Sequence, residues 1–134
     1  MKKRFDLRLL SILCVVVLIF LALSTFAFSA KKEMVEAWIG ADGGEITLEG
    51  RVTITFGEGV LAKKTKIFII YFGDGEYQFG SEVKVEDGMT FTVCFVEPPE
   101  ESVETFKQGE WIEVDSYDGG TCFETNHFSR YRAC

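Results

Sequence analysis

Hydrophobic and polar residues alternate with a period of two in several short segments, a pattern typical of strands with one buried face. The clearest alternation lies in segments 51–56, 89–96 and 110–114, and shorter runs lie at 45–48 and 121–125. Beyond the N-terminal segment, no run carries apolar residues at the 3.6-residue spacing of an amphipathic helix. The pattern therefore predicts an all-β body.

The connections between these segments carry further signals. Segment 65–72, TKIFIIYF, is apolar at positions facing both ways, so we expect a central strand covered on both faces. The run SYDGG at 116–120 predicts a hairpin, because it places Asp-Gly between two strand-like runs. A single helical turn is predicted within 58–65, and an exposed acidic loop with two prolines at 96–105. Short strands at turn-rich spacing indicate one β-sandwich or β-barrel domain.

The first 29 residues carry a different pattern, that of a secretory signal. A basic stretch at 2–8 precedes an uncharged apolar run at 9–23, and the small residues that follow place the expected cleavage after Ser29. The alternative is an uncleaved membrane anchor, because the 20 uncharged residues from 9 to 28 would span about 30 Å as a helix. Either way, we expect residues 30–134 to be extracytoplasmic, secreted or at the cell surface.

Residues 30–134 are more acidic than the whole chain, because residues 1–29 carry mostly basic side chains. The chain has 14 basic and 21 acidic residues, of which four and one lie in residues 1–29, so residues 30–134 keep ten and 20 and a net charge of −10. An acidic body without a basic stripe argues against nucleic acid as a partner and leaves residues 1–29, if uncleaved, as the expected membrane contact. One His and three remaining Cys exclude a zinc-finger array, and no segment indicates a cofactor or metal site.

Three cysteines lie in residues 30–134. An extracytoplasmic location permits disulfides, and a bridge between Cys94 and Cys122 is possible. The alternative, which the sequence slightly favours, is that both are small buried apolar residues with free thiols. Cys134 is a candidate for an intermolecular link between two copies, or for a reactive thiol.

The candidate chemistry lies at His127-Phe128-Ser129. A Ser hydroxyl can attack the carbonyl of the residue before it, and the neighbouring His can take the proton as general base. Such self-cleavage also needs a strained peptide bond and a donor for the oxyanion. The alternative is a terminal strand across 124–132, with His127, Ser129 and Tyr131 on one face.

Several segments together resemble a known family. The run from 39 to 69, with its Gly-Gly and its alternating Thr and Ile, resembles the opening of the ZU-five domain. That module is shared by ankyrins, zonula occludens protein, netrin receptors and many bacterial surface proteins. YQFG at 77–80 is similar to the mid-domain strand of the bacterial members, and 111–131 is similar to their closing hairpin with its His-Phe-Ser ending. The resemblance covers about 36–134.

The resemblance implies a single β-sandwich in residues 30–134 that binds other proteins or builds the cell surface, without small-molecule chemistry. In some animal relatives a matching His-Phe-Ser is a self-cleavage site, which implies a cut between Phe128 and Ser129 with Ser129 as nucleophile and His127 as base. We therefore expect a secreted or membrane-tethered, non-enzymatic module whose partner is a protein or an envelope component. Single-turnover self-processing is the alternative, and an envelope protein dimerised through Cys134 is a third interpretation.

Overall fold

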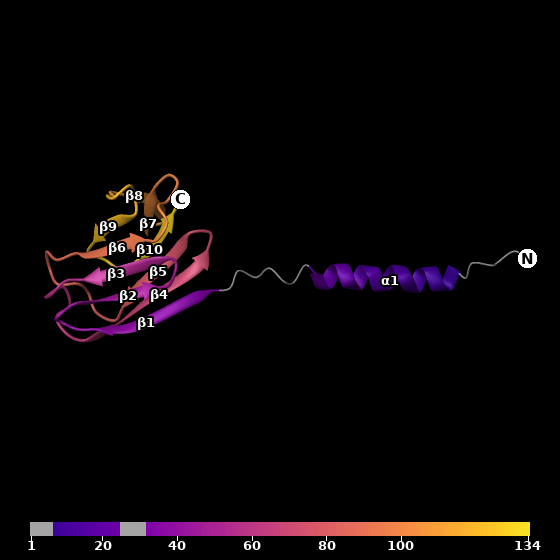
Figure 1. Cartoon of the computed structure of the whole chain (residues 1–134), viewed down its shortest axis with the longest axis horizontal. Coiled ribbons are helices and arrows are strands. Elements are labelled where there is room, and N and C mark those ends of the chain that lie inside the picture. Colours follow the sequence, from indigo (N-terminus) through magenta and orange to yellow (C-terminus); the bar gives the residue numbers. More distant parts are fainter. Residues whose placement is uncertain (1–6, 25–31) are drawn as a thin grey trace, which may run out of the picture. The chain divides into compact units, whose positions relative to one another are not determined.

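The computed structural model describes residues 7–24 and 32–134, which hold one helix and ten strands (Figure 1). The chain divides into two units, residues 1–30 and 31–134. In the first unit, helix α1 (Leu7–Ser24) covers the predicted apolar run. The expected cleavage point after Ser29 lies outside the described residues. No helix in the described ranges is both long enough and apolar enough to cross a membrane.

The second unit consists of two antiparallel sheets, which confirms the all-β prediction for the body. The strands of the large sheet lie in the order β1-β4-β5-β10-β7-β8, with the bounds β1 (Glu33–Ile39), β4 (Thr65–Gly73), β5 (Glu76–Ser81), β10 (Arg130–Ala133), β7 (Val103–Lys107) and β8 (Glu110–Val114). The small sheet has the order β2-β3-β6-β9, with the bounds β2 (Gly44–Leu48), β3 (Val52–Phe56), β6 (Phe91–Phe95) and β9 (Cys122–Thr125).

The two sheets share one hydrophobic core. Every second residue of β3 and of β6 is buried in it, as the alternating pattern predicts. Aromatic rings from the two sheets meet there: the ring centroids of Tyr77 on β5 and Phe95 on β6 lie 5.4 Å apart. Those of Phe123 on β9 and Tyr131 on β10 lie 5.0 Å apart. Segments far apart in the sequence are therefore held together by ring packing.

Strand β4 is buried on one face only, so the prediction of two covered faces is wrong. Ile67 and Ile69 face the core and are fully buried, whereas Phe68 and Ile70 on the other face are half-buried. The Phe68 ring lies over Gly80 on β5, where an added Cβ would fall 1.9 Å from a ring atom. Gly80 thus provides the space that the Phe68 ring occupies.

The turn at 116–120 forms, but the predicted hairpin does not. Asp118 and Gly119 have φ angles of 53° and 71°, and Tyr117 pairs with Cys122 in an isolated bridge. The strands on either side belong to different sheets, since β8 lies in the large sheet and β9 in the small one. The turn therefore carries the chain from one sheet to the other.

Two connecting segments also differ from their predictions. Segment 58–65 contains no helix; instead, Val60 and Leu61 point into the core and are buried. The predicted acidic loop at 96–105 ends early, because Val103 is fully buried and begins β7. In both segments a few apolar residues among polar neighbours are enough to fix the chain against the core.

Candidate functional site

The His127-Phe128-Ser129 segment lies in the connection between the two sheets. β9 ends before it and β10 begins after it, so the alternative prediction of one continuous strand is wrong. The Phe128 ring turns toward the core and stacks on Phe91 with the ring centroids 4.8 Å apart. A second ring, Phe56, lies 6.1 Å away. Phe128 therefore anchors the point where the chain crosses from the small sheet to the large one.

Three side-chain groups fix the backbone around this crossing. The Tyr131 hydroxyl donates to the carbonyl oxygen of His127 at 3.1 Å. The Thr125 hydroxyl lies 3.0 Å from the Tyr131 hydroxyl and 3.1 Å from Nδ1 of His127. Burial raises the pKa of Tyr131, so its hydroxyl keeps the proton that it donates. The imidazole is thus held by a hydroxyl beside it.

The two predicted catalytic side chains have separate partners. The Ser129 hydroxyl donates to the carbonyl oxygen of Phe106 on β7 at 3.0 Å, and in the described part of the chain no hydrogen bond joins Ser129 to His127. Burial lowers the pKa of His127, and the nearby charge of Lys107 lowers it further. The imidazole is therefore neutral at neutral pH, the form in which a His accepts a proton. His127 and Ser129 are close in the sequence, but in the fold Ser129 binds Phe106 and His127 binds Thr125.

The peptide bond after Phe128 shows neither of the other features that self-cleavage needs. The Tyr131 hydroxyl donates to the carbonyl of His127, and the N–H of Phe79 donates to the carbonyl of Ser129 at 3.0 Å. Among the described residues, none donates to the Phe128 carbonyl, where an oxyanion would form. Neither Phe128 nor Ser129 has a positive φ, and no cis peptide bond occurs in the described ranges. This conformation therefore provides no oxyanion donor and no backbone strain at the bond.

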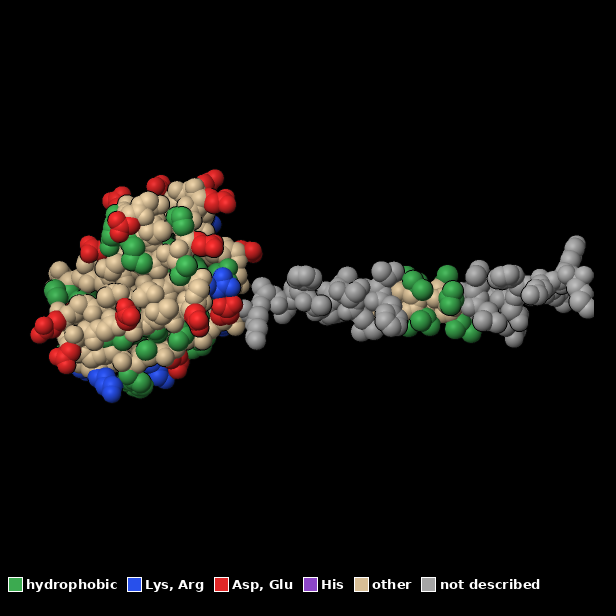
Figure 2. All heavy atoms as spheres, viewed as in Figure 1, with side chains coloured by type: hydrophobic (Ala, Val, Ile, Leu, Met, Phe, Trp, Pro, Cys, Tyr) green, Lys and Arg blue, Asp and Glu red, His purple; other side chains and the backbone are tan. Residues whose placement is uncertain are grey.

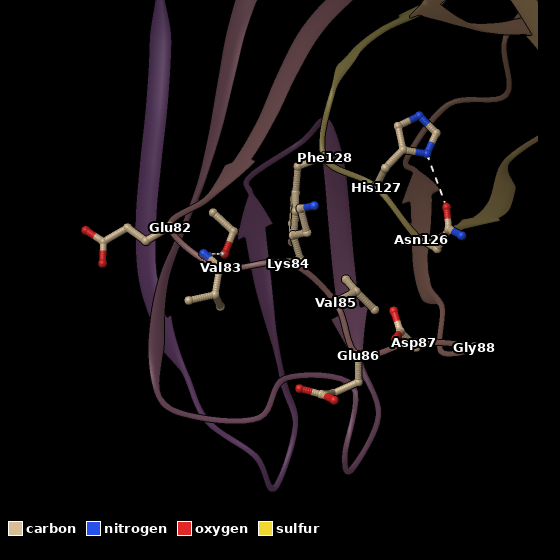
Figure 3. Close-up of a pocket in the computed structure, with 11 residues that line it drawn as sticks. Glu82, Val83, Lys84, Val85, Glu86, Asp87, Gly88, Asn126, His127 and Phe128 are labelled. Atoms are coloured by element: carbon tan, nitrogen blue, oxygen red, sulfur yellow. Dashed lines mark hydrogen bonds between the residues drawn. The ribbon is translucent and has the colours of Figure 1, made fainter.

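A cleft of about 490 Å³ opens beside the same segment (Figure 3). Its walls are the 81–88 loop, which follows β5, and the 126–128 segment, which precedes β10. We call it the β5–β10 cleft, because it lies where these two paired strands diverge. The cleft was not among the sites predicted from the sequence. The available signal was the run EVKVED at 82–87, which alternates charged and apolar residues without belonging to a predicted strand.

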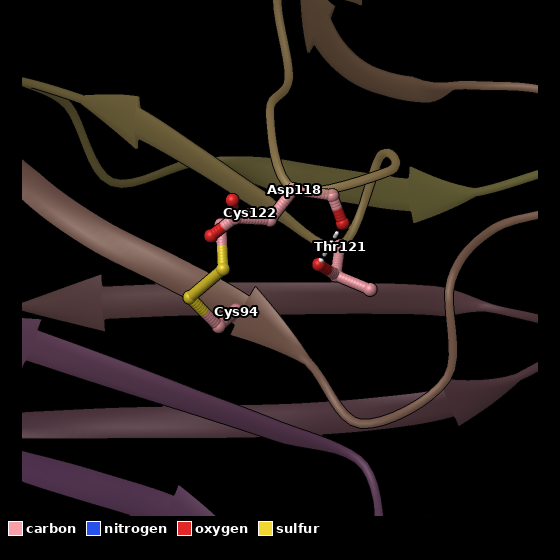
Figure 4. Close-up of a disulfide and its surroundings, with 4 residues drawn as sticks. All are labelled: Cys94, Asp118, Thr121 and Cys122. Carbon is pink, nitrogen blue, oxygen red and sulfur yellow. Dashed lines mark hydrogen bonds between the residues drawn. A yellow bond between two sulfur atoms is a disulfide. The ribbon is translucent and has the colours of Figure 1, made fainter.

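Cys94 and Cys122 are joined by a disulfide (Figure 4). They lie opposite each other on β6 and β9, in adjacent strands of the small sheet. The N–H of Cys122 donates to the carbonyl of Tyr117 rather than to β6, so the two cysteines form a non-hydrogen-bonded pair, in which facing side chains lie closest. The interpretation as two free buried thiols, which the sequence slightly favoured, is therefore wrong. The geometry that decides this comes from strand pairing, which spacing alone does not give.

Cys134 is a free thiol in a half-buried position. Its Sγ donates to Oε2 of Glu104 at 3.4 Å, and the same carboxylate binds Arg132. Burial raises the pKa of the Cys134 thiol, and the Glu104 carboxylate raises it further. Because the thiolate is the reactive form, these neighbours reduce the reactivity of this cysteine.

The outer face of the large sheet, on the side away from the core, carries exposed apolar and aromatic side chains. Trp38 on β1 is 58% exposed, Phe72 on β4 is 39% exposed and Phe106 on β7 is 36% exposed. Arg130 on β10 lies over both phenylalanine rings, 5.8 Å from each centroid, so these side chains share one surface. We call this surface the outer sheet face and define it by the residues Met34, Trp38, Lys66, Phe72, Phe106, Trp111, Arg130 and Arg132.

Each cation on the outer sheet face is paired with an acid. Arg130 contacts Glu76 at 2.9 Å, Lys66 contacts Glu36 at 3.7 Å, and Arg132 binds Glu104. These three pairs neutralise the charges of Lys66, Arg130 and Arg132. The rest of the body carries many acidic side chains, several of which are visible in Figure 2. No pattern in the sequence predicts this surface, because its residues come from strands that are distant in the chain.

A smaller hollow of about 290 Å³ lies beside Arg51. The guanidinium of Arg51 makes two hydrogen bonds to Glu33, of 2.8 and 3.0 Å, and lies 3.8 Å from the centroid of the Tyr71 ring. The Glu33 carboxylate raises the pKa of Arg51 above its ordinary value. Arg51 thus ties the start of β3 to β1 and β4, which is a structural role.

Within residues 7–24 and 32–134, no group of three or more His, Cys, Asp or Glu side chains is placed to hold a metal ion. Comparisons with protein-family models, with curated proteins and with solved structures find no match for this chain. The geometry described above is therefore the basis for proposing a function.

Proposed function

We propose that this chain is a secreted or membrane-tethered, non-enzymatic module that binds another protein or an envelope component through its outer sheet face. The body in this proposal is a β-sandwich of the ZU-five type. Support for that fold comes from the two antiparallel sheets and from the single core to which both contribute. The outer sheet face is the observation that carries the function.

The composition of the outer sheet face supports a protein partner. The buried centre of a protein interface is enriched in Trp, Phe, Met and Arg, and truncations of Trp and Arg are among the most costly for binding. Trp38, Phe106 and Arg130 provide such side chains on one surface. Arg130 is held by ring contacts and by Glu76, so a partner would meet a guanidinium that has already lost much of its freedom.

The proposed location rests on the leader and on the disulfide. A basic stretch followed by an apolar run is typical of a secretory signal, and disulfides persist mainly in oxidising compartments. The Cys94–Cys122 bridge supports such a compartment for the body. Residues 1–29 are either removed on export or kept as the tether.

Cross-linking in the native cell tests the interaction. Three forms of the full chain are compared: the wild type, the double substitution Trp38→Ser with Phe106→Ser, and a control with Val96→Ser and Tyr117→Ser. The control residues are also exposed and apolar, but they lie outside the large sheet. We expect one protein or envelope component to be recovered with the wild type and the control, and its yield to fall about tenfold with the outer-face variant. Equal recovery by all three forms contradicts the proposal.

Self-processing between Phe128 and Ser129 is the alternative proposal. The neutral state of His127 favours it, because a neutral imidazole can act as a base. The hydrogen bond from Ser129 to Phe106 opposes it, because that hydroxyl would have to leave its acceptor before attacking. Intact-mass measurement separates the two functions. We expect a chain that ends at Cys134, whereas self-processing predicts loss of residues 129–134 and recovery of the full mass with Ser129→Ala.

A further inference from the structure

The β5–β10 cleft begins where a strand pair ends. β5 and β10 pair as far as the hydrogen bond from the N–H of Phe79 to the carbonyl of Ser129. Beyond it the 81–88 loop and the 126–128 segment separate and leave about 490 Å³ between them (Figure 3). This volume falls in the range of ligand sites in proteins. The cleft shares no residue with the outer sheet face, so it is a second, independent surface.

The base of the cleft is apolar and fixed. Val85 is buried, and Val83 and Phe128 pack against the core. The stacking of Phe128 on Phe91 holds one wall in place, and the N–H of Glu86 donates to the carbonyl of Val60 at 2.9 Å to hold the other. A ligand would therefore contact a preformed apolar base, with little cost for ordering the protein.

The loop wall has the course of a strand without a partner. Burial alternates along it: Glu82, Lys84 and Glu86 are exposed, whereas Val83 and Val85 point inward, as in an extended segment. Among the described residues, none makes a hydrogen bond to the backbone N–H or C=O of Lys84 or Val85. An extended segment with unpaired backbone groups is the feature to which a peptide adds as a further strand.

The charge of the cleft selects among peptides. Its lining contains three carboxylates and one ammonium group, from Glu82, Glu86, Asp87 and Lys84. His127 adds no charge at neutral pH, because burial and the charge of Lys107 on β7 lower its pKa. The Asp87 side chain extends toward the space between the two walls, whereas the Asn126 side chain turns toward His127 (Figure 3). The lining is therefore net negative and complementary to a cation.

We propose that the β5–β10 cleft binds an extended, basic peptide segment of a partner protein. The peptide backbone pairs with Val85, because the backbone groups of Lys84 and Glu86 point to the opposite edge, where the N–H of Glu86 already donates to Val60. An apolar side chain of the peptide packs against Val83 and Phe128, and the next side chain, Lys or Arg, meets the carboxylate of Asp87. This site stands apart from the outer sheet face, so the test below does not depend on the interaction proposed for that surface.

Fluorescence anisotropy with two labelled peptides tests the proposal on the full chain. The peptides acetyl-TVKVT-amide and acetyl-TVEVT-amide differ only in the central charge. We expect the basic peptide to bind and the acidic peptide to bind about fivefold more weakly or not at all. The substitution Asp87→Asn is expected to weaken binding of the basic peptide about fivefold. Asp118→Asn is the matched control, because Asp118 lies outside the cleft and its positive φ is one that Asn tolerates.

Hydrogen exchange of the backbone amides provides the second measurement. Added basic peptide is expected to slow exchange at Val85 more than at Lys84, because a paired strand protects the amides on the edge that it covers. The proposal is overturned if the two peptides bind equally, if neither binds, or if both aspartate variants lose the same affinity. The proposal is also overturned if lysine amide displaces the labelled basic peptide as well as the unlabelled peptide does. That result would indicate a site for a single cation, which requires no strand pairing.

Discussion

Phe128 is the residue on which the crossing between the sheets depends. Its ring stacks on Phe91 and lies near Phe56, so the central residue of His-Phe-Ser is used for packing. The hydroxyl of Ser129 and the imidazole of His127 each bind a group beside the crossing. A closing motif of this kind is explained by the path of the chain, whether or not the bond after Phe128 is ever cut.

Replacing Phe128 by Ala therefore tests the structural role of the motif. We expect the free energy of unfolding to fall by about 2–3 kcal/mol, because the half-buried ring loses its stacking partners and leaves a cavity. Urea unfolding followed by fluorescence measures the change. Phe106→Ala is the control: that ring lies on the outer sheet face, and its loss should cost less than about 1 kcal/mol. An equal fall in the free energy of unfolding for Phe128→Ala and Phe106→Ala would contradict the anchoring role of Phe128.

Alternation of apolar and polar residues correctly predicted strands that have one buried face. β3 and β6 lie within the segments that the period-two pattern predicts, since every second side chain of each is buried in the core. β8 also lies within its predicted segment, although none of its side chains is fully buried. β7 was hidden in a run read as an acidic loop, because only Val103 and Thr105 are buried in it. The strand exists because it pairs with β8 and β10, a contribution that its own composition does not reveal.

The hairpin prediction failed because a turn signal is local and strand pairing is not. The best local signal, Asp118-Gly119, connects strands of different sheets. Among the hairpins that do form, one joins β4 to β5 through Asp74-Gly75 and another joins β7 to β8 through Gln108-Gly109. All four turn residues have positive φ, as such a tight two-residue turn requires. Gln is an uncommon residue at the first position of such a turn, so the local turn signal at Gln108-Gly109 is weak. Packing of β9 against β6 decided the outcome.

The Cys94–Cys122 bridge acts at the scale of elements, because it fastens β9, an edge strand, to β6. The closed loop spans a sequence separation of 28 residues, for which loss of chain entropy in the unfolded state predicts about 3.5 kcal/mol of stabilisation. We expect Cys94→Ala with Cys122→Ala to lower the free energy of unfolding by this amount in urea.

A reducing agent supplies the control for the disulfide. It should lower the stability of the wild type to that of the double variant and leave the double variant unchanged. Cys134→Ala should behave as the wild type, because Cys134 takes no part in the bridge. A double variant as stable as the oxidised wild type would contradict the structural role of the bridge.

At the scale of the whole molecule, both candidate surfaces arise from strand order. The outer sheet face unites Trp38 on β1, Phe72 on β4 and Phe106 on β7, which are distant in sequence. The β5–β10 cleft unites the 81–88 loop with the 126–128 segment. Sequence patterns identified the His-Phe-Ser motif, because its residues are adjacent. They did not find either surface, because each depends on long-range pairing of strands.

Dimerisation through Cys134 is also decided at this scale, by what surrounds the thiol. Glu104 accepts a hydrogen bond from its Sγ and raises its pKa, so the wild-type thiol is largely protonated near neutral pH and reacts slowly. We expect Glu104→Gln to increase the rate of reaction with a disulfide reagent several-fold and to raise the fraction of linked dimer on non-reducing gels. Glu113→Gln is the matched control, because Glu113 lies opposite Glu104 on β8 and does not contact the thiol.

The measurement uses chains with Cys14→Ser, because Cys14 is exposed and would react in any chain that keeps the leader. Cys134 is then the one free thiol in the described residues. Removing the carboxylate lowers the thiol pKa, so the rate difference between wild type and Glu104→Gln should be largest at neutral pH and shrink as pH rises toward full ionisation of both thiols. Equal rates at neutral pH would show that Glu104 does not protect the thiol. A dimer already dominant in the wild type would favour a Cys134-linked protein.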